Sequence, residues 1–151
     1  MTRYAFSLIF ALFALSFSHP TAFHRYASFK GTKQGQLKGE STKAREKDGW
    51  FEIASIEMGT ELPVDAKSGK PKGARQHGPI VITKQTDAAS PQLLQAHWTN
   101  EVFETIVIQT LDDNNKVTNT TTLKNALISE IKKNGTLESI SFNYDDIVVQ
   151  Q

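Results

Sequence analysis

The chain has 151 residues, enough for one domain with a single hydrophobic core. Its 17 Lys and Arg residues nearly balance 16 Asp and Glu residues, which argues against a general nucleic-acid-binding protein, because such proteins gather a surplus of cations on one face. The absence of cysteine excludes disulfides, thiolate metal sites and cysteine nucleophiles.

The first 22 residues differ from the rest of the chain. Arg3 precedes an apolar run from Ala5 to Phe17, and small residues follow. This layout is typical of a secretory signal peptide, and the run is shorter than the roughly 20 residues of a spanning helix. An uncleaved anchor and a start codon assigned too early are the alternatives. We expect residues 23–151 to form the folded domain, with no stable membrane insertion.

The next segments predict strands and turns. Arg25–Gly31 alternates aromatic and polar residues, which indicates a first strand. The evenly spaced Gly31, Gly35 and Gly39 lack the Gly-Lys-Ser/Thr ending of a phosphate-binding loop, so they are expected to turn or kink strands. Trp50–Gly59 has apolar residues at both alternations, which predicts one strand covered on both faces.

A long polar segment follows this strand and precedes the next one. Residues 60–78 are rich in Pro, Gly and Lys and have no hydrophobic period, and loops of that length are usually functional or mobile. Pro79–Gln85 predicts a strand. Ser90–Asn100 predicts a short helix, with Ser90 as the N-cap and Pro91 at the first helical position.

The remaining sequence is expected to be mostly strand. Val102–Leu111 leads into a turn at Asp112–Asn115. Leu123, Leu127 and Ile131 fit either a helix or a strand, and the β-branched residues before them and the Asn134–Gly135 pair favour a hairpin. Leu137–Gln150 alternates, with Ile140, Phe142 and Tyr144 on one face. The prediction is a mainly β fold, a small barrel or sandwich with one short helix.

The sequence offers little for catalysis. His77 and His97 have no metal-ligand spacing to other residues, and no Gly-x-Ser-x-Gly motif is present. The sequence therefore predicts neither an enzyme nor a cofactor or metal site. Four cations between Lys67 and Arg75 would bind nucleic acid only weakly, so no nucleic-acid partner is expected. Self-assembly is the function that these absences leave.

Several segments in order resemble the hemolysin-coregulated protein (Hcp) family, the tube-forming subunits of bacterial type VI secretion systems. They are YASFKGTKQGQLKGES, DGWFEIASIEMG, GARQHGPIVITKQTDAASPQLLQA and LESISFNYDDI. The most specific pattern consists of Arg75, His77, Pro79, Thr83, Lys84, Asp87, Ala89, Ser90 and Pro91.

The resemblance implies a two-sheet β-barrel with a flanking helix and a long extended loop. It also implies homohexameric rings that stack into a secreted tube, work with other type VI components and can carry small effectors in the lumen. The extended loop would pack on an adjacent subunit or ring, and its implied interface residues are Lys67, Lys70, Lys72, Arg75 and His77. No catalytic residue is implied.

Two routes of export remain open from the sequence. A tube subunit would leave the cytoplasm through the type VI machinery. Residues 1–22 instead fit a separately exported relative that uses the Sec signal route and acts as a secreted binding protein or surface factor.

Overall fold

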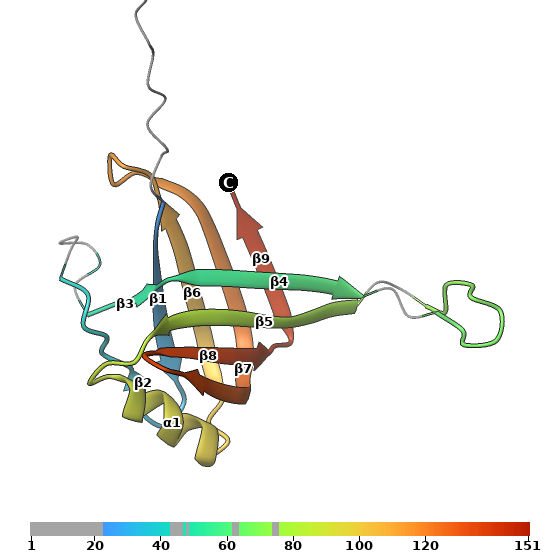
Figure 1. Cartoon of the computed structure of the whole chain (residues 1–151), viewed down its shortest axis with the longest axis horizontal. Coiled ribbons are helices and arrows are strands. Elements are labelled where there is room, and N and C mark those ends of the chain that lie inside the picture. Colours follow the sequence, from blue (N-terminus) through green and yellow to red (C-terminus); the bar gives the residue numbers. More distant parts are fainter. Residues whose placement is uncertain (1–22, 43–46, 48, 62–63, 74–75) are drawn as a thin grey trace, which may run out of the picture.

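The computed structural model describes residues 23–42, 47, 49–61, 64–73 and 76–151 (Figure 1). The predicted signal segment, residues 1–22, lies outside the described residues. Within the described part there are nine strands and one α-helix. In chain order they are β1 (His24–Gly31), β2 (Gly35–Gln36), β3 (Phe51–Ile53), β4 (Ser55–Glu61), β5 (Gln76–Gln85), α1 (Ser90–Trp98), β6 (Phe103–Leu111), β7 (Val117–Asn134), β8 (Leu137–Asn143) and β9 (Asp146–Gln150).

The strands form two antiparallel sheets that share β7. The first part of β7 lies between β6 and β9, and its second part pairs with β8. The first sheet continues from β6 to β1, and the second from β8 to β5 and β4. The pairing of β7 with β8 shifts register between Ile128 and Glu130. The two sheets cross steeply, and α1 lies at one end of the body (Figure 1). The predicted mainly β, two-sheet fold with one short helix is confirmed.

The single strand predicted for Trp50–Gly59 is wrong. The chain bends at Ala54, so that β3 pairs with β1 in the first sheet and β4 pairs with β5 in the second. Phe51 and Ile53 are buried, but Met58 is 53% exposed because β4 is an outer strand. Neither β3 nor β4 is therefore covered on both faces along its whole length.

The C-terminal part also changes sheets. The predicted alternation of Leu137–Gln150 is interrupted at Tyr144 and Asp145, and β9 returns to the first sheet. The predicted β7–β8 hairpin is confirmed. Gly135 adopts a φ of 61° in its turn, a conformation that glycine reaches without steric cost.

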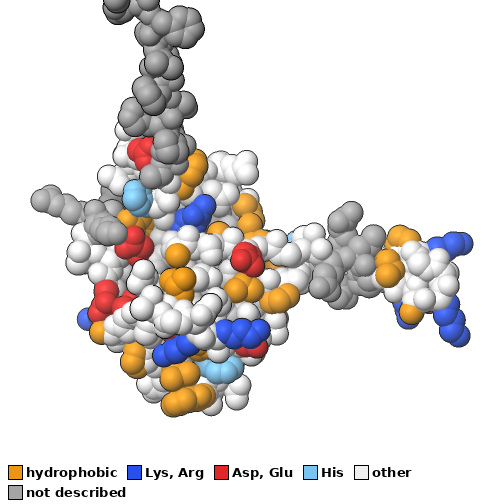
Figure 2. All heavy atoms as spheres, viewed as in Figure 1, with side chains coloured by type: hydrophobic (Ala, Val, Ile, Leu, Met, Phe, Trp, Pro, Cys, Tyr) orange, Lys and Arg blue, Asp and Glu red, His pale blue; other side chains and the backbone are white. Residues whose placement is uncertain are grey.

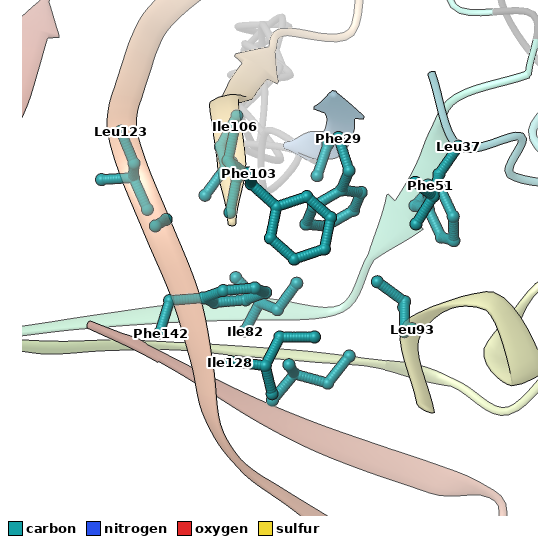
Figure 3. Close-up of a cluster of buried hydrophobic side chains, with 14 of the residues drawn as sticks. Phe29, Leu37, Phe51, Ile82, Leu93, Phe103, Ile106, Leu123, Ile128 and Phe142 are labelled. Atoms are coloured by element: carbon teal, nitrogen blue, oxygen red, sulfur yellow. The ribbon is translucent and has the colours of Figure 1, made fainter. Parts of the chain in front are cut away.

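Four phenylalanines from both sheets form the centre of the core (Figure 3). The Phe29 ring lies 4.9 Å from that of Phe51 and 5.8 Å from that of Phe103, edge to face in both cases. Phe142, which comes from the second sheet, stacks on Phe29, and the centres of the two rings lie 5.9 Å apart. Leu93 of α1 points into the same cluster. Aromatic contacts of this geometry stabilise beyond the area that they bury.

A buried ion-pair network attaches α1 to the second sheet. The fully buried Lys84 ammonium of β5 lies 2.9 Å from the Glu138 carboxylate of β8 and 3.0 Å from the Asp87 carboxylate. The Ser90 hydroxyl donates to the same Glu138 oxygen at 2.6 Å. A buried charge requires such partners, because desolvation is otherwise very costly.

This network explains why the predicted N-cap role of Ser90 is wrong. Ala89 is the N-cap residue and makes no side-chain cap hydrogen bond, and Ser90 begins the helix. The Ser90 hydroxyl is instead occupied by Glu138 and by the backbone N–H of Asp87 at 3.0 Å. The buried charges thus compete successfully for the hydroxyl that local sequence assigns to the helix end.

A second buried carboxylate attaches the β1–β2 turn to the end of α1. One oxygen of Glu101 accepts the backbone N–H groups of Lys33 at 2.8 Å and Gln34 at 2.6 Å. The other oxygen accepts the Gln34 side-chain amide at 2.8 Å. Burial by itself raises the pKa of Glu101, but the hydrogen bonds from Gln34 and Lys33 and the charge of Lys33 outweigh it, and the pKa lies below its ordinary value.

We expect Lys84→Met to lower the free energy of unfolding by about 3–5 kcal/mol, because it leaves Glu138 and Asp87 without their cation. Lys30→Met, which breaks the exposed Lys30–Glu104 pair, should cost less than about 1 kcal/mol. Urea denaturation of both variants measures the difference. Equal, small losses in the two variants would contradict a stabilising role of the buried pair.

Glu101→Gln should destabilise the fold by about 1–3 kcal/mol at pH 7, because the amide nitrogen would face the Gln34 amide donor. Since the folded-state pKa of Glu101 is lowered, its contribution is present above the unfolded pKa of about 4.3 and is lost as the pH falls through the folded value. The gap between wild type and variant should therefore narrow in acid. Glu104→Gln is the exposed control, and a gap that is constant between pH 7 and pH 3 would refute this origin.

Candidate functional site

The strands β4 and β5 extend beyond the sheet as an arm, here defined as residues 59–78, that projects from the body (Figures 1 and 2). β4 continues to Glu61 and β5 starts at Gln76. The sequence prediction of a loop over residues 60–78 is wrong at both ends, because cross-strand pairing of Thr60 with His77 extends the hairpin. The backbone ladder thus carries the arm away from the core.

Two glycines and a tyrosine form the root of the arm. The register shifts between Met58 and Thr60, and a Cβ on Gly78 would lie 3.2 Å from the Gly59 carbonyl oxygen. The Tyr144 hydroxyl donates a hydrogen bond to the Gly78 carbonyl oxygen at 3.1 Å. Burial raises the pKa of Tyr144, so the hydroxyl stays protonated and able to donate. Tyr144 therefore connects the body of the protein to the root of the arm.

The tip of the arm is a compact turn organised by Asp65. Its carboxylate accepts the backbone N–H groups of Ser68 at 2.8 Å and Lys67 at 3.0 Å, together with the Ser68 hydroxyl at 3.0 Å. The Ser68 backbone hydrogen bond, the Ser68 hydroxyl and the Lys67 N–H lower the pKa of Asp65. A bridge between Val64 and Pro71 closes the turn. The tip thus has a defined shape.

Of the residues predicted for the interface, three lysines meet at this tip. Lys67, Lys70 and Lys72 are exposed (Figure 2), and no ion pair involves them in the part of the chain that the structure describes. His77 lies apart from them at the root, with its ring centroid 6.5 Å from that of Tyr144. Arg75 lies outside the described residues.

The described residues contain no group of three or more His, Cys, Asp or Glu side chains placed to hold a metal ion. None of the helices in the described ranges has the length and apolar character to cross a membrane. His97 has a structural contact, since its Nδ1 lies 3.1 Å from the Ile128 carbonyl oxygen and joins α1 to β7.

Sequence reasoning did not identify Tyr144 as part of this site. It placed Tyr144 on a face with Ile140 and Phe142, but it could not foresee that β8 pairs with β5, with Phe142 opposite Ile80, which brings Tyr144 beside Gly78. The one available signal was the pair of glycines at the ends of the polar segment, Gly59 and Gly78.

The chain is similar in sequence to known proteins. Residues 26–151 match the family model described as type VI secretion system effector, Hcp. The major exported protein of Pseudomonas aeruginosa is 34% identical over 119 residues, which cover 71% of this chain and 69% of that protein.

Solved structures show the same fold. The secreted protein Hcp3 from Pseudomonas aeruginosa has a TM-score of 0.66 at 29% identity, covering 82% of this chain and 88% of that one. The Hcp1 protein from E. coli EAEC 042, a mutant, has a TM-score of 0.74 at 24% identity, covering 83% and 89%. At 24% identity, the likeness to the E. coli protein shows the fold alone.

We expect Tyr144→Phe to loosen the arm while the core stays intact, because the ring remains and only the hydrogen bond to Gly78 is lost. A net loss of about 1 kcal/mol would speed the exchange of arm amides about fivefold. Hydrogen exchange over β4 and β5 measures the effect, with the β6–β7 amides as the internal control. Unchanged exchange of the arm amides would contradict the proposal that the hydrogen bond of Tyr144 stabilises the arm.

Proposed function

Since the chain belongs to the Hcp family of type VI secretion system proteins, we propose that it is a structural subunit of the inner tube of that system. Copies form hexameric rings, the rings stack, and the assembled tube is exported and carries effectors in its lumen. The arm is the observation that carries this proposal: its described tip is a compact, cationic turn, and it projects from the body of its own chain (Figure 1).

The physical character of the arm supports a partner. An isolated two-stranded hairpin is marginally stable in water, so contacts with another molecule would stabilise it. Met58 at its base and Val64 at its tip are 53% and 56% exposed. A second copy of the chain would bury this apolar surface through a heterologous contact, in which different surfaces of the two copies meet.

We assign the subunit contact to Lys67, Lys70, Lys72 and His77, together with Arg75. Long cationic side chains at the edge of a contact steer association and determine register more than they add affinity. Apolar burial would supply most of the affinity, and each stable contact should bury more than roughly 1,000 Å² in total. This role is non-catalytic, and it needs neither metal nor cofactor.

The N-terminal segment supports a second candidate function. Arg3 and the apolar run that follows it fit a signal peptide on residues 1–22, ahead of a folded domain of residues 23–151. A separately exported relative that acts as a binding protein or surface factor would have this segment removed. N-terminal sequencing of the protein from cells separates the two: an end between Ser18 and Phe23 that depends on Sec export favours this candidate.

We expect the full chain to form rings and stacked rings in solution, detected by sedimentation velocity and electron microscopy. Replacing residues 62–75 by an Asn-Gly turn, which suits the paired ends Glu61 and Gln76, should leave a folded protein that no longer stacks. Asp113→Ala in the exposed β6–β7 turn is the control and should assemble normally. A wild-type chain that stays monomeric at high concentration would exclude the tube subunit.

A further inference from the structure

The tip of the β7–β8 hairpin contains the only Asn-Gly pair in the chain. Asn134 is the last ladder residue of β7 and pairs with Leu137, so that Gly135 and Thr136 form a two-residue turn. Gly135 has a φ of 61°, which suits the first central position of a type II′ turn. Asn134, Gly135 and Thr136 are all exposed to solvent.

Two groups at this tip are free to react with each other. Among the described residues, no hydrogen bond engages the Asn134 carboxamide, and the Gly135 N–H donates to no other group. A Cβ built on Gly135 would meet no atom within 4 Å, so the space around this residue is open. Bonding of the Gly135 nitrogen to the carboxamide carbon of Asn134 closes a five-membered ring, and intramolecular attack of this kind needs no second reactant to be brought together.

We propose that Asn134 is a site of self-modification. The Gly135 backbone nitrogen attacks the side-chain carbonyl carbon of Asn134, and the new N–C bond closes a succinimide ring. The bond from that carbon to the carboxamide nitrogen breaks, and this nitrogen leaves as ammonia with the proton that the Gly135 nitrogen gives up. Water then adds to either carbonyl of the ring and opens it, which leaves aspartate or isoaspartate at position 134.

The glycine makes this asparagine different from the others in the chain. A side chain on the following residue crowds the attacking nitrogen, and glycine has none. Every other asparagine precedes a residue with a side chain, which makes these positions internal controls: Asn100, Asn114, Asn115, Asn119, Asn125 and Asn143.

The hairpin slows the reaction without preventing it. Asn134 must rotate out of its extended ladder conformation to bring its side chain over the Gly135 nitrogen. It belongs to the last pair of the hairpin, and terminal pairs open locally at low free energy. The Thr86 N–H donates to the Thr136 carbonyl at 2.8 Å and holds the turn against the end of β5. Conversion in the folded protein should therefore be slower than in the denatured chain.

The modification would act next to the buried ion-pair network. The ladder pair that follows Asn134–Leu137 is Lys133–Glu138, and Glu138 is a partner of the buried Lys84. Isoaspartate routes the backbone through the former side chain and adds one carbon atom to β7, so the tip pair can no longer match its partner on β8. We therefore expect the isoaspartate form to have a looser hairpin. This change needs no partner, so the inference goes beyond the proposed tube function and does not depend on it.

Peptide mapping of the purified full chain, kept folded at mildly alkaline pH, tests the reaction. Conversion raises the mass of the peptide that contains residue 134 by about one dalton, and chromatography separates its aspartate and isoaspartate forms. We expect both forms at position 134 while the other asparagines stay unchanged. The rate should rise with pH, because the attacking nitrogen must lose its proton, and it should rise further in urea.

Two variants identify the reacting groups. Asn134→Gln keeps a carboxamide but would require a larger ring, so conversion at this position should be lost. Gly135→Asp places a Cβ beside the attacking nitrogen at a positive φ that aspartate tolerates, and it should slow conversion about tenfold or more. Asn114→Gln in the exposed β6–β7 turn is the matched control and should leave the rate at Asn134 unchanged. Thermal denaturation confirms that each variant is folded.

An intact Asn134 in the folded protein, after a time in which the urea-denatured chain has converted, would overturn the inference. Conversion of the Gly135→Asp variant at the wild-type rate would do the same. Hydrogen exchange of the isoaspartate form, separated by ion exchange, tests the structural consequence: the Leu137 and Glu138 amides should exchange about fivefold faster or more, with the β6–β7 amides unchanged. Equal exchange in the modified and unmodified proteins would overturn the predicted loosening.

Discussion

The burial of the Lys84 ammonium is the constraint on which much of this structure depends. A cation inside a small core needs anionic partners, and here they come from β8 and from the segment that precedes α1. The helix is thereby fixed to the second sheet at its first residue, Ser90. At the far end of the helix, Glu101 holds the β1–β2 turn. Two buried charges, Lys84 and Glu101, thus determine how a helix, a sheet and a turn are placed together.

The same placement shapes both ends of the molecule. Gln92 of α1 hydrogen-bonds the backbone of Lys38 in both directions, at 3.2 Å and 3.1 Å. This contact attaches the segment after β2 to the helix. At the other end of β5, Tyr144 supports the arm.

Part of the motif that resembles the Hcp family has a structural role in this chain. Lys84, Asp87 and Ser90 form the buried network, and none of them lies on the arm. Such a network contributes to a single arrangement of the core as well as to stability. The surface residues of the same pattern, such as His77, lie at the root of the arm. Residues that maintain the fold therefore follow closely, in one segment of the sequence, the residues that we propose for assembly.

The sequence by itself determined the mainly β fold, the position of the helix and the β7–β8 hairpin, because periodicity and turn chemistry are local properties of neighbouring residues. It also placed the cations of the arm. Only the tertiary structure decided that Ser90 serves Glu138 and that Tyr144 meets Gly78, because these partners are 48 and 66 positions apart in the chain.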